Sequence, residues 1–261
     1  MHKLTLKEID QLLANTDELS DPLFEEIALD TRLGAKKLIE KHQNRLLTNQ
    51  QLWKKHEDRI SFEKQITAAG YFYIAGVDEV GRGPLAGPVV TAAVILDYTD
   101  KSWIGITDSK QLTPTKRKSF SDLIKSKAIA YSIAVVDSTT IDRINIYEAT
   151  KVAMVQSVQQ LSIQPDYLLI DAMTINSSIQ QMSLVKGDQR SLSIAAASII
   201  AKEFRDDLMV EYSQMYPEFG FDKHMGYGTK QHLHAIQQYG VTPIHRQSFA
   251  PVAQATKTYK K

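Results

Sequence analysis

The stretch from Asp78 to Pro84 (Asp-Glu-Val-Gly-Arg-Gly-Pro), which we call the corner, follows an apolar run and combines two carboxylates, two glycines and an arginine. Carboxylate oxygens are hard ligands for a divalent cation. The glycines let the backbone approach a ligand closely, and the arginine can meet a phosphate. A phosphodiester is therefore the simplest substrate for such a corner.

The two adjacent acids pose a geometric problem. Neighbouring residues of a regular strand point to opposite faces, so Asp78 and Glu79 can serve one site only if the chain leaves strand geometry there. Gly81, Gly83 and Pro84 lead us to expect that departure. The alternative is an exposed acidic turn at a strand end. Apolar residues on both sides of the pair argue against exposure.

Two further carboxylates stand at the ends of predicted elements. Asp171 ends the apolar run 167–170, and Asp188 stands at the start of a predicted helix rich in small residues, just before residue 191. Each of them alone could be a turn residue or a helix cap. Together with Asp78 and Glu79 they would repel one another at one point unless cations neutralised them. The four suit a two-metal hydrolytic site, in which cations hold the attacking water and the leaving oxygen and no protein nucleophile is needed.

The chain contains no cysteine, so a metal must have oxygen or imidazole ligands, which favours Mg²⁺ or Mn²⁺. Arg82, Lys110 and Lys186 can hold the flanking phosphates. A lone lysine is more often a surface charge, so these assignments depend on the nearby acids. We do not expect a zinc site among the C-terminal histidines, because His232 and His234 are two residues apart and face different ways on one helix.

The elements that must position these residues follow from periodicity. Three predicted strands with short connections indicate an antiparallel meander, and the later strands and helices indicate a mixed α/β sheet. Runs rich in β-branched and aromatic residues predict strands at 71–77, 89–96, 128–136, 167–171 and 182–185. Helical spacing predicts helices at 139–161, 191–209 and 229–239.

The first part of the chain shows helical patterning and almost no strand signal. Residues 1–68 are predicted to form a helical N-terminal extension, and residues 69–261 a catalytic domain with a helical C-terminal part. Acidic residues dominate the start of the extension and basic residues its later half. The extension is either a helical hairpin that pairs its own charges or a basic face that helps to hold nucleic acid.

Composition places the chain among globular proteins. Its 261 residues suffice for a real core, with 43% hydrophobic and 23% charged residues. The net charge is only +1, so any contact with nucleic acid must come from local basic clusters. We find no signal peptide or membrane-spanning stretch and expect a cytoplasmic protein. No oligomer signal is evident, so we expect a monomer.

The corner and the residues after it, through Val89, closely resemble type 2 ribonucleases H, specifically the bacterial ribonuclease HII family. Several further motifs follow in the order of that family between about residues 71 and 249, so the match is specific. They are Asp108-Ser109-Lys110, Leu169-Ile170-Asp171-Ala172, Lys186-Gly187-Asp188, the helical segment 193–202 and residues 224–229 (His-Met-Gly-Tyr-Gly-Thr).

The resemblance implies a ribonuclease H-like fold with a mixed five-stranded sheet flanked by helices. It places the four catalytic, metal-binding acids on Asp78, Glu79, Asp171 and Asp188. It also implies that the backbone of Gly81, Arg82 and Gly83 reads the ribose, and that Tyr227 stacks on or packs against the next deoxyribose. This agrees with the chemistry of the residues, since the 2′-hydroxyl distinguishes RNA from DNA.

The implied reaction is endonucleolytic hydrolysis 5′ to a ribonucleotide in RNA–DNA hybrids or ribonucleotide-containing duplex DNA. The products are 3′-hydroxyl and 5′-phosphate ends, and the use in the cell is removal of misincorporated ribonucleotides and RNA primers. A non-catalytic hybrid-binding protein of the same fold is the alternative, which the complete set of acids opposes. A mononucleotide-binding site is a third hypothesis, but the chain has no Gly-Lys-Ser/Thr P-loop and no dinucleotide fingerprint.

Overall fold

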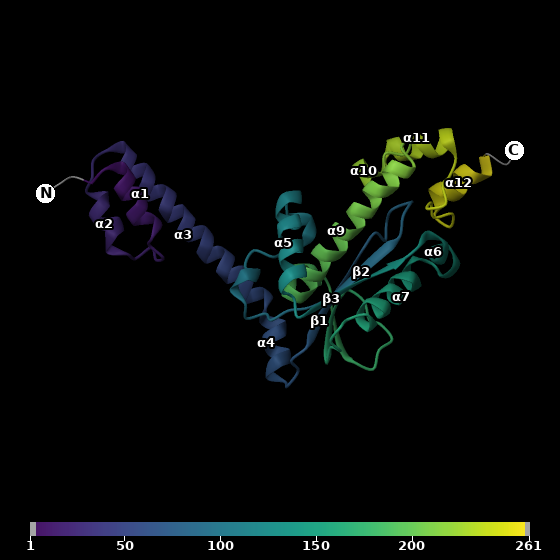
Figure 1. Cartoon of the computed structure of the whole chain (residues 1–261), viewed down its shortest axis with the longest axis horizontal. Coiled ribbons are helices and arrows are strands. Elements are labelled where there is room, and N and C mark those ends of the chain that lie inside the picture. Colours follow the sequence, from purple (N-terminus) through teal and green to yellow (C-terminus); the bar gives the residue numbers. More distant parts are fainter. Residues whose placement is uncertain (1–3, 259–261) are drawn as a thin grey trace. The chain divides into compact units, whose positions relative to one another are not determined.

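The computed structural model describes residues 4–258 of the chain (Figure 1). It contains two compact units, Met1–Asp58 and Arg59–Lys261. Each unit has its own hydrophobic core. All the residues predicted to do chemistry belong to the second unit.

A five-stranded mixed sheet forms the centre of the second unit, with the strand order β3-β2-β1-β4-β5. The pairs β1–β2 and β2–β3 are antiparallel, whereas β1–β4 and β4–β5 are parallel. The predicted meander and mixed sheet are therefore confirmed. The strands are β1 (Ile74–Val80), β2 (Val89–Ile95), β3 (Ala130–Val136), β4 (Tyr167–Asp171) and β5 (Gln180–Leu184).

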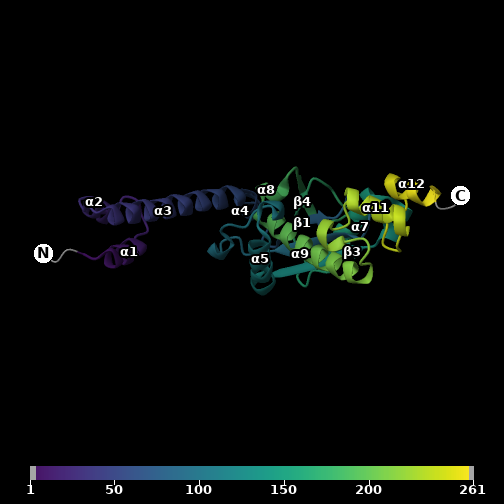
Figure 2. The same ribbon diagram turned by 90° about the horizontal axis from the view of Figure 1, so that it is seen from above.

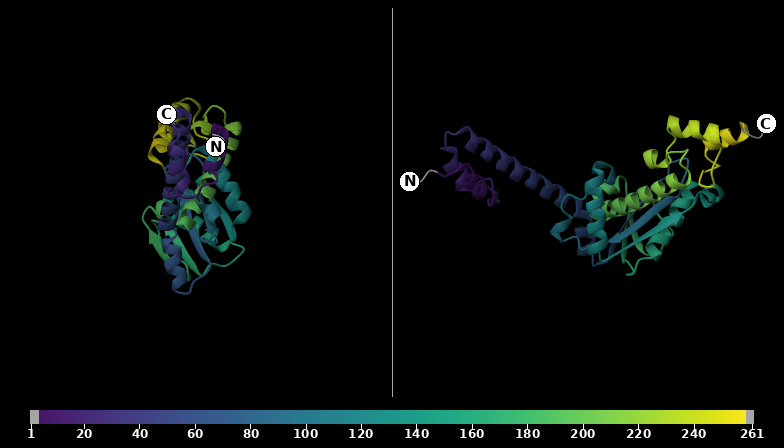
Figure 3. Two further views of the ribbon diagram at one scale, coloured as in Figure 1. Left: turned by 90° about the vertical axis from the view of Figure 1, so that its left-hand side faces the viewer. Right: turned by 45° about the horizontal axis from the view of Figure 1, so that its top comes forward.

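The rest of the second unit is largely helical. Its helices are α4 (Ser61–Ala68), α5 (Pro114–Lys127), α6 (Ser138–Ile144), α7 (Ile146–Gln159), α8 (Gly187–Arg190), α9 (Leu192–Met215), α10 (Phe221–His224), α11 (Lys230–Tyr239) and α12 (Ala250–Thr258). Helices α10, α11 and α12 lie beyond one end of the sheet (Figures 1 and 3). Two 3₁₀ turns, η1 (Lys101–Trp103) and η2 (Ser109–Gln111), precede α5.

Two expectations about these elements are wrong. The connection between β2 and β3 is not short, because it holds η1, η2 and α5. Helix α5 is mostly polar and buries only Ser121 and Ile124, so it carries little apolar periodicity. The predicted helix 139–161 is divided into α6 and α7 at Asn145, which has a φ of 66° and accepts hydrogen bonds from the first N–H groups of α7.

Helices α9 and α7 cover opposite faces of the sheet (Figure 1). The small residues Ala195 to Ala197 of α9 pack against Val90, Ala92 and Val94 of β2. On the other face, Met154 and Val158 of α7 pack against apolar residues of β1 and β2. The predicted close approach of the small-residue helix to the sheet is confirmed.

The C-terminal helices pack against the loop that follows the corner. Leu85 and Ala86 lie in one cluster with Phe219, Phe221 and Ile236. This cluster places helices α10 and α11 beside the end of β1, where the predicted chemistry lies.

The first unit is helical, as predicted (Figure 2). Its helices are α1 (Leu6–Ala14), α2 (Pro22–Ala28) and α3 (Leu33–Arg59), and the last residue of α3 already belongs to the second unit. Asp10 accepts hydrogen bonds from Lys41 at 3.0 Å and pairs with His42 at 2.6 Å, so some charges of the unit do pair with each other. Lys54 and Lys55 are exposed. A nucleic-acid role for such residues stays a prediction.

Helix α4 is tied to the start of α9 through Glu63. One oxygen of this buried carboxylate accepts hydrogen bonds from the Ser191 hydroxyl at 2.7 Å and from the Ser193 N–H at 3.0 Å. A carboxylate at a helix N-terminus stabilises the orphan N–H groups there. Ile66 of the same helix is buried beside Ile74. Helix α4 is thus part of the packing of the second unit.

Truncation tests the predicted boundary after residue 68. We expect a chain that begins at Arg59 to melt cooperatively, and a chain that begins at residue 69 to lose at least about 2 kcal/mol of stability, because it lacks Glu63 and Ile66. Urea unfolding of both chains measures this. Equal stability would show that α4 contributes nothing. If basic residues of the extension hold nucleic acid, the first truncation also raises KM and flattens its salt dependence.

Candidate active site

Three acids converge where the pairing between β1 and β4 ends. Asp78, Glu79 and Asp171 each offer a carboxylate oxygen, and these oxygens all lie within 4.8 Å of one another. The parallel register pairs Val77 with Ile170, so the next residues along the two strands are Asp78 and Asp171. The structure therefore brings together three of the four predicted acids.

The expectation that the chain leaves strand geometry at Asp78 and Glu79 is wrong. Strand β1 continues to Val80, and the two acids pair in antiparallel register with Ala92 and Thr91 of β2. The pairing of β1 with β4, in contrast, ends at Val77. The Asp78 carboxylate accepts a hydrogen bond from the Glu79 N–H at 2.7 Å, so it is turned toward the neighbouring residue. The left-handed turn comes only at Gly81, with φ 89°.

Burial and mutual repulsion disfavour the charged forms of these acids. Asp78 is only 4% exposed, and burial, followed by the charges of Glu79 and Asp171, raises its pKa well above the usual value. Burial also raises the pKa of Glu79, against the opposing effect of Arg82, whose guanidinium lies 3.3 Å away. The pKa of Asp171 is raised by burial although the Gly187 N–H donates to it at 2.6 Å.

The same three acids fit a divalent cation. Their donors are all oxygens, and Glu79 Oε2 is buried with no hydrogen-bond partner in the described part of the chain. A buried carboxylate oxygen without a partner is costly unless a cation binds it. The donor set and the missing partner thus agree with the sequence-based expectation of Mg²⁺ or Mn²⁺.

The fourth predicted acid, Asp188, lies nearby but outside this group of three. It is buried in α8, and burial together with the charges of Asp108 and Asp171 raises its pKa to about 6. Lys186, at the start of α8, is exposed and has a left-handed backbone with φ 56°.

Asp108 is an acid of this region that the sequence-based list of site residues lacks. It is buried, caps η2 by accepting from the Lys110 N–H at 2.9 Å, and accepts from Gln189 at 3.4 Å. Its charge raises the pKa of both Asp171 and Asp188. The only signal for it in the sequence is its place in the Asp108-Ser109-Lys110 motif.

The predicted substrate-binding residues lie in the corner or close to it. Burial would lower the pKa of Lys110, but the charges of Asp108, Asp188 and Asp78 together raise it. Tyr227 is 47% exposed and lies beside Gly83, since a Cβ on that glycine would be 3.5 Å from the tyrosine ring. The ammonium group of Lys110 therefore lies near the acids, and the exposed ring of Tyr227 lies beside Gly83.

Two buried arginines support the corner, and sequence reasoning missed both. Arg246 donates to the carbonyl oxygens of Gly81, Arg82 and Gly87 at 2.5, 2.8 and 2.9 Å. Arg205 of α9 donates to three other carbonyls at 3.0 to 3.2 Å, those of Ala86, Pro88 and Met225. An arginine in a polar segment is usually exposed, so nothing in the sequence marks these two.

A chain of hydrogen bonds through two buried histidines reaches the backbone of Tyr227. The Thr242 N–H donates to His245 Nδ1 at 2.9 Å, so His245 carries its proton on Nε2 and donates to His232 Nε2 at 3.0 Å. His232 Nδ1 then donates to the Tyr227 carbonyl at 3.0 Å. Burial lowers the pKa of His232 to about 4 and that of His245 to about 3. Both rings are therefore neutral near pH 7.

This series of hydrogen bonds through His232 and His245 predicts that the free energy of unfolding depends on pH. The unfolded state binds protons on these histidines below about pH 6.5 and the folded state does not, so their contribution is complete above pH 6.5 and is lost as the pH falls. We expect His245→Gln to reduce the slope of unfolding free energy between pH 6.5 and 5 by up to about 1.4 kcal/mol per pH unit. Urea unfolding measures the slope. His234→Gln is the control, because His234 is exposed, and an unchanged slope in His245→Gln would contradict the assignment.

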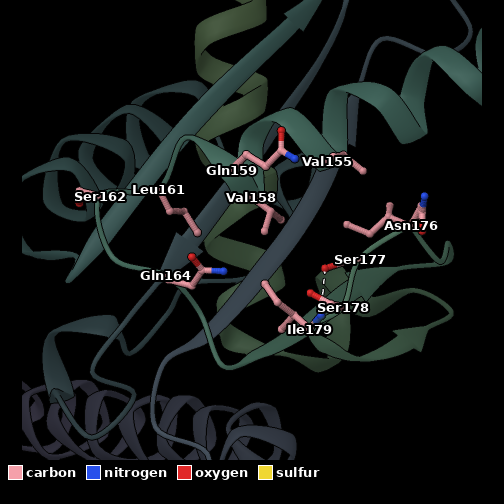
Figure 4. Close-up of a pocket in the computed structure, with 11 residues that line it drawn as sticks. Val155, Val158, Gln159, Leu161, Ser162, Gln164, Asn176, Ser177, Ser178 and Ile179 are labelled. Atoms are coloured by element: carbon pink, nitrogen blue, oxygen red, sulfur yellow. Dashed lines mark hydrogen bonds between the residues drawn. The ribbon is translucent and has the colours of Figure 1, made fainter.

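The structure also has a cavity of about 570 Å³ between α7 and the segment before β5 (Figure 4). Its lining includes Val155 and Val158 of α7 and the loop residues Ser177 and Ile179, and none of its lining residues is charged. The cavity therefore lacks the groups that phosphodiester chemistry requires.

Acids at the ends of adjoining central strands, in a mixed five-stranded sheet flanked by helices, define a nuclease of the ribonuclease H-like class. The sequence model of the family "Ribonuclease HII" matches residues 75–252, and that of the "Ribonuclease HII N-terminal domain" matches residues 5–67. A ribonuclease HII of Halalkalibacterium halodurans is 49% identical over 98% of this chain and 97% of its own length. The chain belongs to the ribonuclease HII family.

Solved structures agree with this assignment. The ribonuclease H2 from Pyrococcus horikoshii OT3 is 28% identical, with a TM-score of 0.63, and the match covers 72% of this chain and 99% of that one. Bst-RNase HIII in complex with Mn²⁺ shares the fold, with 22% identity, a TM-score of 0.55 and coverage of 73% and 71%. The predicted fold, family and enzyme class are confirmed, and nothing in the comparisons supports the non-catalytic alternative.

Within residues 4–258, no helix combines the length and the apolar character that a bilayer span requires.

Proposed function

We propose that this chain is an endonuclease that hydrolyses the phosphodiester 5′ to a ribonucleotide in RNA–DNA hybrids and in duplex DNA that contains ribonucleotides, leaving 3′-hydroxyl and 5′-phosphate ends. The observation that carries the proposal is the convergence of Asp78, Glu79 and Asp171 directly beside the glycines at 81 and 83 of the corner. Membership of the ribonuclease HII family supports it. Removal of misincorporated ribonucleotides and of RNA primers is the use that follows from this activity.

We propose Asp78, Glu79, Asp171 and Asp188 as the catalytic acids that hold the divalent cations, Mg²⁺ or Mn²⁺. Bound cations would supply activation of the attacking water and stabilisation of the charge on the leaving oxygen. The burial and mutual repulsion of the carboxylates support this role. A bound cation would offset both the cost of burying their charges and the repulsion between them. Mn²⁺ in the related Bst-RNase HIII structure agrees with it.

The chain's own groups orient the substrate. In our proposal, backbone groups of Gly81, Arg82 and Gly83 contact the 2′-hydroxyl, and Tyr227 stacks on the following deoxyribose. Arg82, Lys110 and Lys186 bind the flanking phosphates. The exposure of Tyr227 beside Gly83 supports this assignment, since an exposed ring next to the ribose-reading backbone is available to the substrate.

One assay tests the proposed activity. A DNA duplex with a single ribonucleotide is incubated with the protein in Mg²⁺, Mn²⁺ or EDTA, beside the same duplex without the ribonucleotide. We expect nicking 5′ to the ribose only in the presence of metal. The proposal fails if the ribonucleotide strand stays intact in both metals.

Replacement of Arg82 tests phosphate binding. Arg82→Ala is expected to lower kcat/KM on the single-ribonucleotide duplex about 10- to 100-fold, because a charge-assisted hydrogen bond contributes about 1.5–3 kcal/mol. Steady-state kinetics measure this. Arg143→Ala removes an exposed arginine of α6 and serves as the control. Equal kcat/KM in the two variants would exclude the role of Arg82.

We also propose that the protein works as a monomer and in the cytoplasm, where its nucleic-acid substrate lies. The compact second unit contains all the proposed site residues of one chain, so the site needs no second copy. Sedimentation velocity at micromolar concentration tests the oligomeric state, and a dimer at that concentration would contradict it.

A further inference from the structure

The two buried arginines of the site carry an inference beyond the proposed roles. Arg205 and Arg246 are both 0% exposed, and in the described part of the chain neither is ion-paired to a carboxylate. Burial of a guanidinium without a counter-ion is costly unless its N–H groups are satisfied. Backbone carbonyl oxygens satisfy both of them. Both arginines thereby fix segments of backbone in place.

The arginines connect the corner to the loop that carries Tyr227. Arg246 holds the carbonyls of Gly81 and Arg82, and Arg205 holds that of Met225, two residues before Tyr227. Further backbone hydrogen bonds join the same segments: the Leu85 N–H donates to Gly226 O at 2.8 Å, and the Arg246 N–H donates to Leu85 O at 2.8 Å. The glycine at 226 is required, since a Cβ there would lie 2.4 Å from Ala86 O.

The held carbonyls determine where the corner's N–H groups point. In a planar trans peptide the C=O of one residue and the N–H of the next point in opposite directions. Arg246 binds the carbonyls of Gly81 and Arg82. The N–H groups of Arg82 and Gly83, which belong to the same two peptides, must therefore point away from Arg246. Two successive donors are thus aimed outward from the buried guanidinium.

We propose that Arg246, assisted by Arg205, is a positioning residue for ribose recognition: it orients the peptide groups of residues 81–83 and links them to Tyr227. This inference rests on the proposed function, in which those peptide groups contact the 2′-hydroxyl. The two arginines do not touch the substrate. They set the geometry of the groups that do, and their buried positive charge polarises the peptides toward an electronegative ligand.

Arg246→Lys separates shape from charge. Lysine retains the positive charge, but a single ammonium does not reproduce the planar fork that spans three carbonyls. The protein is prepared with Asp78→Asn as the parent, so that bound duplex is not cleaved. The affinity for a duplex with one ribonucleotide is divided by that for the same all-DNA duplex. We expect Arg246→Lys to lower this selectivity ratio at least about 10-fold, as expected for the loss of a buried hydrogen-bond geometry.

The selectivity ratio distinguishes positioning from general stability, because a merely destabilised protein loses affinity for both duplexes alike. Arg45→Lys is the matched control: Arg45 also donates to three carbonyls, those of Leu13, Ala14 and Thr16, but in the first unit. It should leave the ratio unchanged. Hydrogen exchange in residues 81–87 should accelerate in Arg246→Lys and not in the control.

Each outcome decides the inference. If Arg246→Lys melts cooperatively with an unchanged ratio, the inference is overturned, although wild-type cleavage of the ribonucleotide duplex would leave the proposed function intact. If Arg246→Lys does not fold, the same ratio is measured in Arg205→Lys, and failure of both variants to fold assigns the arginines an exclusively structural role and overturns the inference. A parent without any preference for the ribonucleotide overturns ribose reading by the corner and this inference with it.

Discussion

Asp78→Asn is expected to reduce kcat at least about 10³-fold, which corresponds to about 4 kcal/mol of transition-state stabilisation. Asp78 is the most buried of the three converging acids, and its carboxylate lies within 4.8 Å of the other two. An amide of the same shape keeps the packing but offers a neutral ligand in place of a charged one. Affinity for the duplex should change little, because phosphate contacts come from other residues.

The same substitution should stabilise the metal-free protein. The folded-state pKa of Asp78 is raised above its unfolded value by burial and by the neighbouring carboxylates. The folded state then binds the proton more tightly, so stability is present at low pH and is lost as the pH rises above the unfolded pKa of about 3.9. Asparagine removes this loss. We expect a higher melting temperature than wild type in EDTA at pH 8, and a smaller rise on addition of Mn²⁺.

This prediction is specific because Asp78→Asn should lower the activity and raise the stability of the metal-free protein. A residue needed only for folding would lose both together. Asp122→Asn is the control, since Asp122 is exposed on α5 and pairs with Lys118. Calorimetric melting with and without Mn²⁺, beside single-turnover cleavage, measures both quantities. Normal turnover in Asp78→Asn would show that the metal ligands are assigned wrongly.

Strands β2 and β4 could be predicted from the sequence because each is a short, mostly apolar run. Strand β3, in contrast, alternates buried and less buried residues, and β5 is mostly polar. Burial on both faces explains such runs: all seven residues of β2 are buried, between α9 and α7. Helix α5 could not be predicted in this way, because it contributes few buried side chains. The break at Asn145 was missed because apolar spacing continues across it, and only a positive φ at a non-glycine residue marks it.

In the site, the side chains that project toward a ligand were easier to predict than those that hold them. Asp78 and Asp171 end apolar runs, where a carboxylate needs an explanation. Arg205 and Arg246 are defined by the carbonyl oxygens that they contact, and these come from segments far away in the chain. Hydrogen bonds between side chains and distant backbone leave no local pattern in a sequence.

The second large effect is expected at Gly76, in the middle of β1. A Cβ at this position would lie 2.0 Å from the backbone carbon of Ser193 and 2.3 Å from the Ile194 nitrogen. Backbone atoms of the first turn of α9 have no rotamer by which to move aside. Gly76→Ala must therefore push α9 away from the sheet, and we expect it to lower the free energy of unfolding by at least about 3 kcal/mol. Urea unfolding measures this.

The displacement should also reach the active site, because α9 carries Ser198, whose hydrogen bond favours the charged form of Asp78. Cleavage by Gly76→Ala should therefore fall even at temperatures where the variant is folded. Gly70→Ala is the control: a Cβ on Gly70 meets nothing within 4 Å, but its φ of 97° imposes backbone strain. It should cost about 1–2 kcal/mol. An effect of Gly76→Ala on unfolding no larger than that of Gly70→Ala would contradict the prediction, because α9 would then move aside at no more than the cost of ordinary backbone strain.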